Sequence, residues 1–313
     1  MRVLITGATG FIGRTVAAQL AGRGALLRCL VRSSSDRSVL SGIDCEFVEG
    51  DLTDSGSLTS AVEGCSTVLH LGAETAPVAR DRVAAVNVKG SGELARVARE
   101  SGVERFVYAS TLLVARHGLN RPRGWARVAR SKLEGESAVL RHMPAVVFRL
   151  APCFGPNDHL VCPLMARIRR PWPISWFLGQ GTFQTQPLWV EDAAECLALA
   201  ALEGKTSSSP REIAGPEVMS VLEFWDALAC ALRVFRIRLH LPETFLRIAG
   251  FPLARMRGRL DALRLAETFI GHTAAEQNFS PVLLGRPLVT LEEGLARMLG
   301  TSEKKEAPAG AGA

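Results

Sequence analysis

Three glycines near the start of the chain have the spacing of a phosphate-binding loop. Gly7, Gly10 and Gly13 follow an apolar run at residues 2–6, and residues 14–20 have helical character. A strand, a glycine turn and a helix in this order let backbone N–H groups approach a pyrophosphate with no Cβ in the way. The positive end of the helix dipole then faces the phosphates. An ordinary strand-to-helix turn is the plainer alternative, but the complete setting favours a dinucleotide site.

The elements that must position this loop alternate between strand and helix. Apolar runs predict strands at 2–6, 26–32, 45–48, 67–71, 105–111 and 145–150, with helices after Asp54, at 80–100 and at 126–142. This order predicts a Rossmann-like α/β fold with a doubly wound parallel sheet. Ligands bind such sheets at the carboxyl ends of the strands. The segments expected to form a site are therefore Gly7–Gly13, Arg32–Ser35, Gly50–Asp54, His70–Glu74 and Ser110–Thr111.

The second half of the chain changes in character and predicts a smaller C-terminal part. Helices are expected at 160–170, 191–202 and 217–232, a strand at 186–190 and a loop at 171–183. Ser220 with Glu223 has the pattern of a helix-capping box. The predicted division is a dinucleotide domain at 1–155 to which 184–204 returns, a smaller cap domain at 156–183 and 205–300, and a disordered tail at 301–313.

Composition excludes several classes of protein. The 313 residues are 47% apolar and 22% charged, as in an ordinary globular protein. A net charge of +6 favours anionic ligands or surfaces. The arginines are dispersed and the chain has one tyrosine, so nucleic acid is not an expected partner.

The seven cysteines have no CxxC or Cys/His ligand spacing, which predicts reduced thiols and no metal site. No leader and no apolar run of about 18 residues is evident, so we expect a cytoplasmic protein. Residues 165–180 mix arginine with tryptophan and phenylalanine, and residues 245–259 continue that mixture. Peripheral membrane association is one interpretation of these segments, and ordinary domain packing with a basic face is the other.

Motifs in the order of one known family extend nearly end to end. The matching pieces are Thr6–Gly13, Gly50–Asp54, His70–Ala73, Asn87–Gly90, Tyr108–Thr111, Lys132 within Arg130–Glu136, Arg149–Pro156 and Pro187–Asp192. The chain resembles the extended and atypical short-chain dehydrogenase/reductases, the NAD-dependent epimerase/dehydratase-like group. The resemblance implies an N-terminal part that binds a dinucleotide and a smaller C-terminal part that covers a substrate.

The resemblance also implies roles at the strand ends. Asp51 would hydrogen-bond the adenine amino group, with a turn or N-cap role as the alternative. Leu71, Gly72 and Ala73 would line the pyrophosphate and the nicotinamide ribose through their backbone. His70 would be a strand-end histidine with no ligand role. The implied cofactor set is Gly7, Thr9, Gly10, Phe11, Ile12, Gly13, Arg32, Ser33, Asp51, Leu52, Leu71, Gly72, Ala73, Asn87 and Lys132.

Arg32 and Ser33 end the second strand, where NAD-preferring members carry an acid for the ribose 2′-hydroxyl. An arginine suits a 2′-phosphate instead. We therefore predict NADP(H) as the preferred cofactor, with NAD(H) as the other option. The alternative role of Arg32 is to stack on adenine.

The catalytic residues depart from the family pattern. The family uses a Tyr-x-x-x-Lys pair on one helix, with a Ser or Thr at the end of the fifth strand. The tyrosine is the general acid/base, and the lysine binds the nicotinamide ribose and lowers the tyrosine pKa. Lys132 and Thr111 are present, but Val128 stands where the tyrosine belongs. Tyr108 is the one tyrosine, and it belongs to the fifth strand and should point into the core.

Five other residues are substitutes to consider. His117 lies in the loop before the helix, and Trp125 precedes the helix closely enough to cover the nicotinamide. Glu74, Asp158 and His159 lie near the expected site. Each has a plainer interpretation as an exposed loop group or a packing residue.

Residues 179–192 and 214–219 are similar to the NADPH-binding accessory subunit of respiratory NADH:ubiquinone oxidoreductase, a subgroup that keeps the nucleotide site and can lack the tyrosine. Two functions therefore stay open. One is an NADP(H)-binding protein with weak, altered or no catalysis that acts through a protein partner or a membrane surface. The other is an active NADP-dependent oxidoreductase or epimerase/dehydratase, with a non-Tyr acid/base, on a nucleotide-sugar-like or apolar carbonyl or hydroxyl substrate. A homodimer is also left open.

Overall fold

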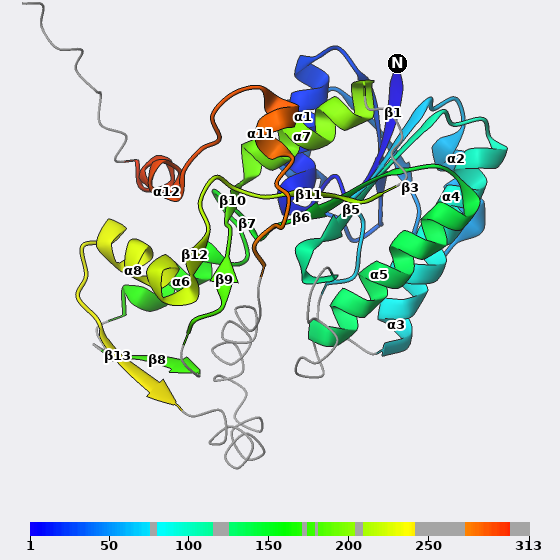
Figure 1. The fold of residues 1–313 in the computed structure, drawn as a ribbon. Coiled ribbons are helices and arrows are strands. Elements are labelled where there is room, and N and C mark those ends of the chain that lie inside the picture. The colour runs from blue at the N-terminus through cyan, green and yellow to red at the C-terminus, as the bar shows by residue number, and fades with distance from the viewer. Residues whose placement is uncertain are drawn as a thin grey trace, which may run out of the picture.

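A seven-stranded parallel sheet forms the centre of the computed structural model (Figure 1). The structure describes residues 1–75, 80–114, 125–170, 174–178, 181–203, 209–241 and 273–300. The strand order is β11-β6-β5-β4-β1-β2-β3, and each neighbouring pair is parallel. The strands are β1 (Arg2–Thr6), β2 (Leu26–Val31), β3 (Cys45–Glu49), β4 (Thr67–His70), β5 (Arg105–Thr111), β6 (Val146–Leu150) and β11 (Arg211–Ile213). The α/β fold and the first six strands are confirmed.

Helices cover both faces of this sheet because successive residues of a strand point to opposite sides. Val3 and Ile5 of β1 pack toward α1 and α7, whereas Leu4 packs on the other face among residues of α2, α4 and α5. Figure 1 shows these two helical layers on either side of the strands. The helices are α1 (Phe11–Gly22), α2 (Ser55–Val62), α3 (Arg80–Ala84), α4 (Ser91–Glu100), α5 (Trp125–His142) and α7 (Val190–Glu203). Short 3₁₀ turns occupy Arg37–Leu40 and Leu112–Val114.

The prediction of one uninterrupted helix at 80–100 is wrong in one respect. A π-helical turn, Ala85–Gly90, separates α3 from α4. A Cβ on Gly90 would lie 2.6 Å from the backbone oxygen of Leu52, so the helix approaches the β3–α2 loop closely here. Wide turns of this kind often occur at functional sites. This one carries the buried Asn87.

The rest of the described chain forms three small two-stranded sheets and four helices, and three of these helices pack around a separate apolar cluster. That cluster includes Phe154, Trp189, Phe224 and Leu295. The small sheets pair β7 (Cys153–Phe154) with β10 (Leu188–Trp189), β9 (Gln184–Thr185) with β12 (Met219–Ser220), and β8 (Ile174–Leu178) with β13 (Ile237–Leu241). The helices are α6 (Val161–Ile168), α8 (Val221–Ala231), α11 (Ser280–Leu284) and α12 (Leu291–Leu299).

Three expectations for this half need correction or confirmation. The stretch expected as a loop at 171–183 contains β8, which pairs with a strand more than fifty residues away and so could not be seen locally. The predicted capping box of Ser220 and Glu223 is confirmed at the start of α8. Residues 211–213, which we assigned to the smaller part, add the edge strand β11 to the main sheet. The domain division as a whole stays a prediction.

Several predicted features lie outside the described residues: His117, the tail at 301–313 and the arginine-rich stretch at 245–259. Of the segment 165–180, the structure describes 165–170 and the backbone of β8. Within the described ranges, no helix combines the length and apolar character needed to cross a bilayer.

Candidate dinucleotide and active site

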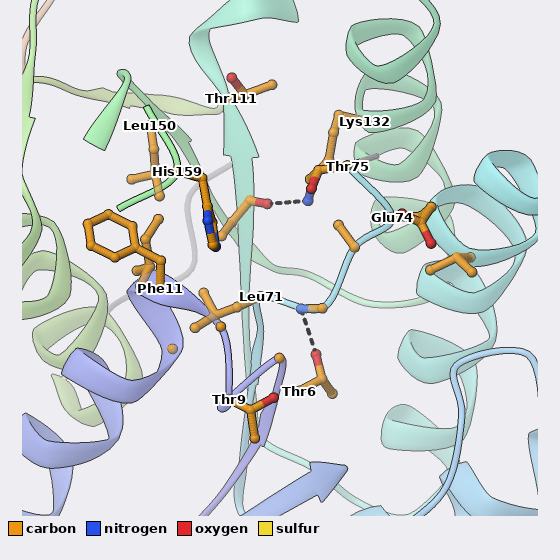
Figure 2. A pocket seen from close by; sticks show the side chains of 18 of the residues that line it. Thr6, Thr9, Phe11, Leu71, Glu74, Thr75, Thr111, Lys132, Leu150 and His159 are labelled. Atoms are coloured by element: carbon orange, nitrogen blue, oxygen red, sulfur yellow. Dashed lines mark hydrogen bonds between the residues drawn. The ribbon is translucent and has the colours of Figure 1, made fainter. Parts of the chain in front are cut away.

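A cavity of about 970 Å³ opens at the carboxyl ends of the central strands (Figure 2). Its wall combines the glycine loop, the ends of β2 to β6 and the loop before α6. The predicted site residues that line it are Gly7, Thr9, Gly10, Phe11, Ile12, Gly13, Arg32, Asp51, Leu52, Leu71, Gly72, Ala73, Thr111 and Lys132. Ser33, Asn87 and Val128 are not part of the wall. The fold thus brings together segments that are distant in the sequence.

The glycine loop has the geometry of an anion cradle. Gly7 adopts a φ of +74°, which favours glycine, and its carbonyl oxygen accepts a hydrogen bond of 3.0 Å from the N–H of Gly10. A Cβ on Gly13 would lie 2.1 Å from that same oxygen. No side chain caps the N-terminus of α1 at Gly10, and its first turn contains no acid. The residues therefore fit a pyrophosphate, because the first N–H groups of the helix face the cavity without a protein partner in the cap.

The far end of the cavity combines a cation with a fixed carboxylate. The Asp51 carboxylate accepts hydrogen bonds from the Thr53 N–H and hydroxyl, at 2.9 and 2.7 Å. Partial burial raises the pKa of Asp51, but the Thr53 hydrogen bonds and the charges of Arg32 and Arg82 outweigh it, so the pKa is lowered overall. The Ser35 hydroxyl accepts from the Arg32 N–H at 3.1 Å and shapes the strand end. Ser35, from the expected segment Arg32–Ser35, lines the cavity, and so does Arg82, which the sequence did not single out.

His70 is fully buried beneath the glycine loop. Its ring nitrogens hydrogen-bond Thr6 Oγ1 at 2.6 Å and Ser91 Oγ at 2.8 Å. Burial lowers the pKa of His70 to about 3, so the ring is neutral. The Thr6 hydroxyl oxygen also accepts from the Gly72 N–H at 3.0 Å, which fixes the turn after β4. His70 thus supports the wall through its hydrogen bonds to Thr6 and Ser91, as a satisfied strand-end histidine.

Lys132 and Thr111 both line this cavity. In Figure 2 Thr111 ends β5 and Lys132 extends from α5 toward the same space. Lys132 is 7% exposed, and its Nζ donates to the Ala109 carbonyl oxygen at 2.8 Å. Burial lowers the pKa of Lys132 to about 8. Val128, one turn earlier on α5, is buried and contributes only two methyl groups.

Tyr108 does not replace the missing tyrosine. It is 1% exposed, and its ring lies behind Lys132, with the ring centroid 4.9 Å from Nζ. Burial raises the pKa of its phenol. A Cβ on Gly135 of α5 would lie 2.6 Å from the Tyr108 hydroxyl, so that hydroxyl is enclosed under the helix. The expectation that Tyr108 points into the core is confirmed.

Two buried networks hold this corner in place, and sequence reasoning missed both. Glu136 is 3% exposed and accepts from Arg149 at 3.1 and 2.7 Å and from the Ser110 hydroxyl. Asn87 accepts from the Glu74 N–H at 2.7 Å and donates to the Glu74 carbonyl oxygen at 2.9 Å and to Ser131 Oγ at 2.9 Å. Glu136, Arg149 and Asn87 all lie inside the family motifs matched above. That position was the one feature of the sequence that could have pointed to these networks. Asn87 lies behind the wall and fixes the loop after β4.

The remaining candidates have distinct places. Asp158 caps α6, because its carboxylate accepts from the N–H groups of Leu160, Val161 and Cys162. His159 is exposed and lines the cavity across from Lys132 (Figure 2). Glu74 lines the cavity and pairs with Arg82 at 3.4 Å, so it is less solvated than we expected. The backbone of Trp125 begins α5.

Comparison with known proteins establishes the family to which the chain belongs. The model of the NAD dependent epimerase/dehydratase family matches residues 3–214. The chain belongs to this family. The predicted resemblance is therefore confirmed, and with it the assignment of the sheet to an NAD-binding fold.

Relatives of the chain carry the names of different activities. The chain is 27% identical to 2-alkyl-3-oxoalkanoate reductase of Stenotrophomonas maltophilia, over 96% of this chain and 99% of that protein. It is 32% identical to ceramide reductase of Caulobacter vibrioides, over 61% and 58%. It is 26% identical to the mitochondrial NADH dehydrogenase [ubiquinone] 1 alpha subcomplex subunit 9 of Arabidopsis thaliana, over 80% and 61%.

Solved structures confirm the fold. The structure of gox2253 superposes with a TM-score of 0.74 at 22% identity, covering 95% of this chain and 96% of that one. MoeE5 in complex with UDP-glucose and NAD gives 0.73 at 22% identity, covering 96% and 98%.

Proposed function

We propose that the chain binds NADP(H) in the cavity at the carboxyl ends of the strands. Arg32 carries this proposal, since it lines the cavity at the end of β2, where an acid would select NAD(H). A guanidinium suits the dianionic 2′-phosphate through charge-assisted hydrogen bonds. NAD(H) is the alternative cofactor, and Arg32 would then stack on adenine.

The cavity offers a place for each part of the dinucleotide. Backbone N–H groups at the start of α1 would hold the pyrophosphate, and Asp51 would accept from the adenine amino group. Arg32 would hold the 2′-phosphate from the cavity wall, with Ser33 next to it outside the wall. Lys132 and the backbone of Leu71, Gly72 and Ala73 would hold the nicotinamide ribose. The bound cofactor supplies hydride transfer, and the protein residues supply orientation, charge and protons.

The residues of this chain argue against catalysis by the usual route of the family. Val128 cannot donate or accept a proton, and the buried Tyr108 is enclosed beneath α5. We therefore infer weak, altered or no turnover by that route. Thr111 and Lys132 line the cavity, where they would contact a bound ligand.

The second candidate is an active NADP-dependent oxidoreductase or epimerase/dehydratase with a different proton donor. It is supported by aliphatic side chains beyond Thr111, where Leu113, Leu150, Pro152 and Leu160 line the cavity. Such a wall suits an apolar carbonyl or hydroxyl compound better than a charged sugar nucleotide. The reductase names of two relatives agree with that class.

The cellular location, the domain division and the binding partners of the chain are also part of this proposal. All seven cysteines are free thiols, which supports a reducing, cytoplasmic setting. Residues 1–155 with 184–204 would form the dinucleotide half and residues 156–183 and 205–300 the substrate half, apart from β11. A protein partner, a membrane surface and a homodimer are options for a protein whose main role is to bind the cofactor.

Fluorescence titration tests the binding proposal. NADPH emission should rise and shift as the cofactor enters the cavity, and NADH should bind at least about tenfold more weakly. Equal affinity for the two cofactors would overturn the preference, and no binding of either would overturn the site.

Restoring the phenol tests the catalytic statement. Val128→Tyr should raise the rate of carbonyl reduction with NADPH, because it returns an acid one turn before Lys132. Val128→Phe has nearly the same volume and no hydroxyl, and it serves as the matched control. An equal effect of the two substitutions would remove Val128 as the cause of altered catalysis.

A further inference from the structure

Lys132 has an unusual position for a charged side chain. It is 7% exposed, yet it lines the cavity rather than the core. An ammonium group has three N–H donors. Among the described residues, Nζ has one recorded hydrogen bond, to the Ala109 carbonyl oxygen at 2.8 Å. The remaining N–H groups are available to a ligand in the cavity.

Within the described residues, the Glu136 carboxylate attracts the Lys132 ammonium through space but makes no ion pair with it. Glu136 lies one turn after Lys132 on α5, but Arg149 and Ser110 hold its two oxygens. Behind Lys132 lies the ring of Tyr108, which stabilises a cation without accepting its proton. Burial lowers the pKa of Lys132 to about 8, so its proton can be given up near neutral pH. A donor with a pKa close to the working pH is well suited to proton transfer.

We propose that Lys132 is the proton donor of this cavity: its ammonium hydrogen-bonds the oxygen of an apolar carbonyl compound and protonates it directly. Of the two N–H groups that remain beside the bond to Ala109, one would hold the nicotinamide ribose and the other the carbonyl oxygen, so this role differs from that of a lysine that only assists a neighbouring tyrosine. It rests on the proposed binding of NADP(H), which supplies the hydride.

The reaction balances without any further reagent. Hydride from the reduced dinucleotide goes to the carbonyl carbon, and the proton of the Lys132 ammonium goes to the carbonyl oxygen. The C=O π bond breaks, and a C–H and an O–H bond form. The carbonyl compound is reduced to an alcohol, the dinucleotide is oxidised, and the neutral amine of Lys132 regains its proton from water.

Other polar groups of the cavity fit the role less well. His159 lies across the cavity and is exposed, so no burial fixes its ring against a ligand. Glu74 pairs with Arg82. The Thr111 hydroxyl can donate a hydrogen bond to the same oxygen, but a hydroxyl does not give up its proton at neutral pH. His159 is therefore the comparator in the experiment.

The first measurement asks whether Lys132 reaches a bound carbonyl. Decanal and sodium cyanoborohydride are added near pH 8, without dinucleotide, and the alkylated lysines are mapped by mass spectrometry. The chain has five lysines, which makes the map simple. Lys132 should be alkylated at least about tenfold faster than the exposed Lys89, because its amine is partly neutral and faces the apolar cavity. Labelling no faster than at Lys89 would overturn the proposal.

The second measurement follows NADPH oxidation by decanal. Lys132→Arg keeps the charge and hydrogen-bond donors but cannot lose a proton, so at an NADPH concentration that saturates the variant it should lose oxidation by at least about a hundredfold. Lys132→Met should also lose oxidation, and it serves if the arginine does not fit. His159→Ala should retain oxidation. No oxidation by wild type, or oxidation that survives in Lys132→Arg and disappears in His159→Ala, would overturn the proposal.

The experiments distinguish a failure of the proposed NADP(H) binding from a failure of the proton-donor role of Lys132. If NADPH does not bind, the dinucleotide site is wrong, while the labelling of Lys132 still reports on its contact with the carbonyl. If NADPH binds and Lys132 is neither labelled nor required for oxidation, the proton-donor role alone is wrong.

Discussion

The Cα of Gly13 stands so close to the carbonyl oxygen of Gly7 that a Cβ on Gly13 would lie 2.1 Å from it. Gly13→Ala should therefore push α1 away from the loop, destabilise the fold by about 1–3 kcal/mol and abolish NADPH binding. Urea unfolding and fluorescence titration measure the two effects. Gly22, at the other end of α1, is the matched control, since a Cβ there meets nothing within 4 Å. Equal effects of the two substitutions would contradict this geometry.

Arg32 should select the phosphorylated cofactor. Arg32→Ala removes the guanidinium from the cavity and should weaken NADPH binding by about 10–100-fold while changing NADH binding by less than about threefold. Isothermal titration with both cofactors checks this. Arg37→Ala is the control, because Arg37 pairs with Glu49 at 2.9 Å outside the cavity. A parallel loss of NADPH and NADH affinity would favour stacking on adenine.

Glu136 should matter far more to stability than an ordinary acid of α5. Glu136→Ala leaves the Arg149 charge half-buried and unpaired, which should cost about 3–5 kcal/mol. Glu134→Ala, on the same helix, breaks only an exposed pair with Arg130 and should cost less than about 1 kcal/mol. Chemical denaturation of the two variants gives both numbers. Similar values would mean that the buried pair adds no more than a surface pair.

Lys132 should make stability depend on pH in the alkaline range. Its pKa in the folded chain is about 8, below the ordinary value near 10.4, so between these values the native state binds fewer protons than the unfolded state. Stability therefore rises with pH through this window, and below it the full cost of the buried charge is present. Lys132→Met should be more stable than wild type at about pH 7, with the difference shrinking toward about pH 10.

Urea unfolding at both pH values measures that difference. Lys89→Met is the control, because Lys89 is exposed and its removal should give a difference that does not change with pH. A Lys132→Met variant that is less stable than wild type at neutral pH would show that the charge is compensated in the apo cavity.

Local patterns were enough for much of the fold. The runs at 2–6 and 105–111 form β1 and β5, because a fully buried parallel strand needs a continuous apolar sequence. The pairing of β8 with β13 and the addition of β11 were not predictable, because each depends on a partner far along the chain. The π-helical turn around Asn87 depends likewise on the loop that it approaches.

For the site, residue types determined the chemistry and the fold determined the contacts. The spacing of Gly7, Gly10 and Gly13 predicts a phosphate loop, and Val128 before Lys132 removes the usual acid, since both facts depend only on which atoms each residue carries. Burial, by contrast, is a property of packing. Only the tertiary structure could place Tyr108 beneath α5, assign Glu136 to Arg149 and leave the Lys132 ammonium facing the cavity, because desolvation and hydrogen bonding come from neighbours that the linear sequence does not supply.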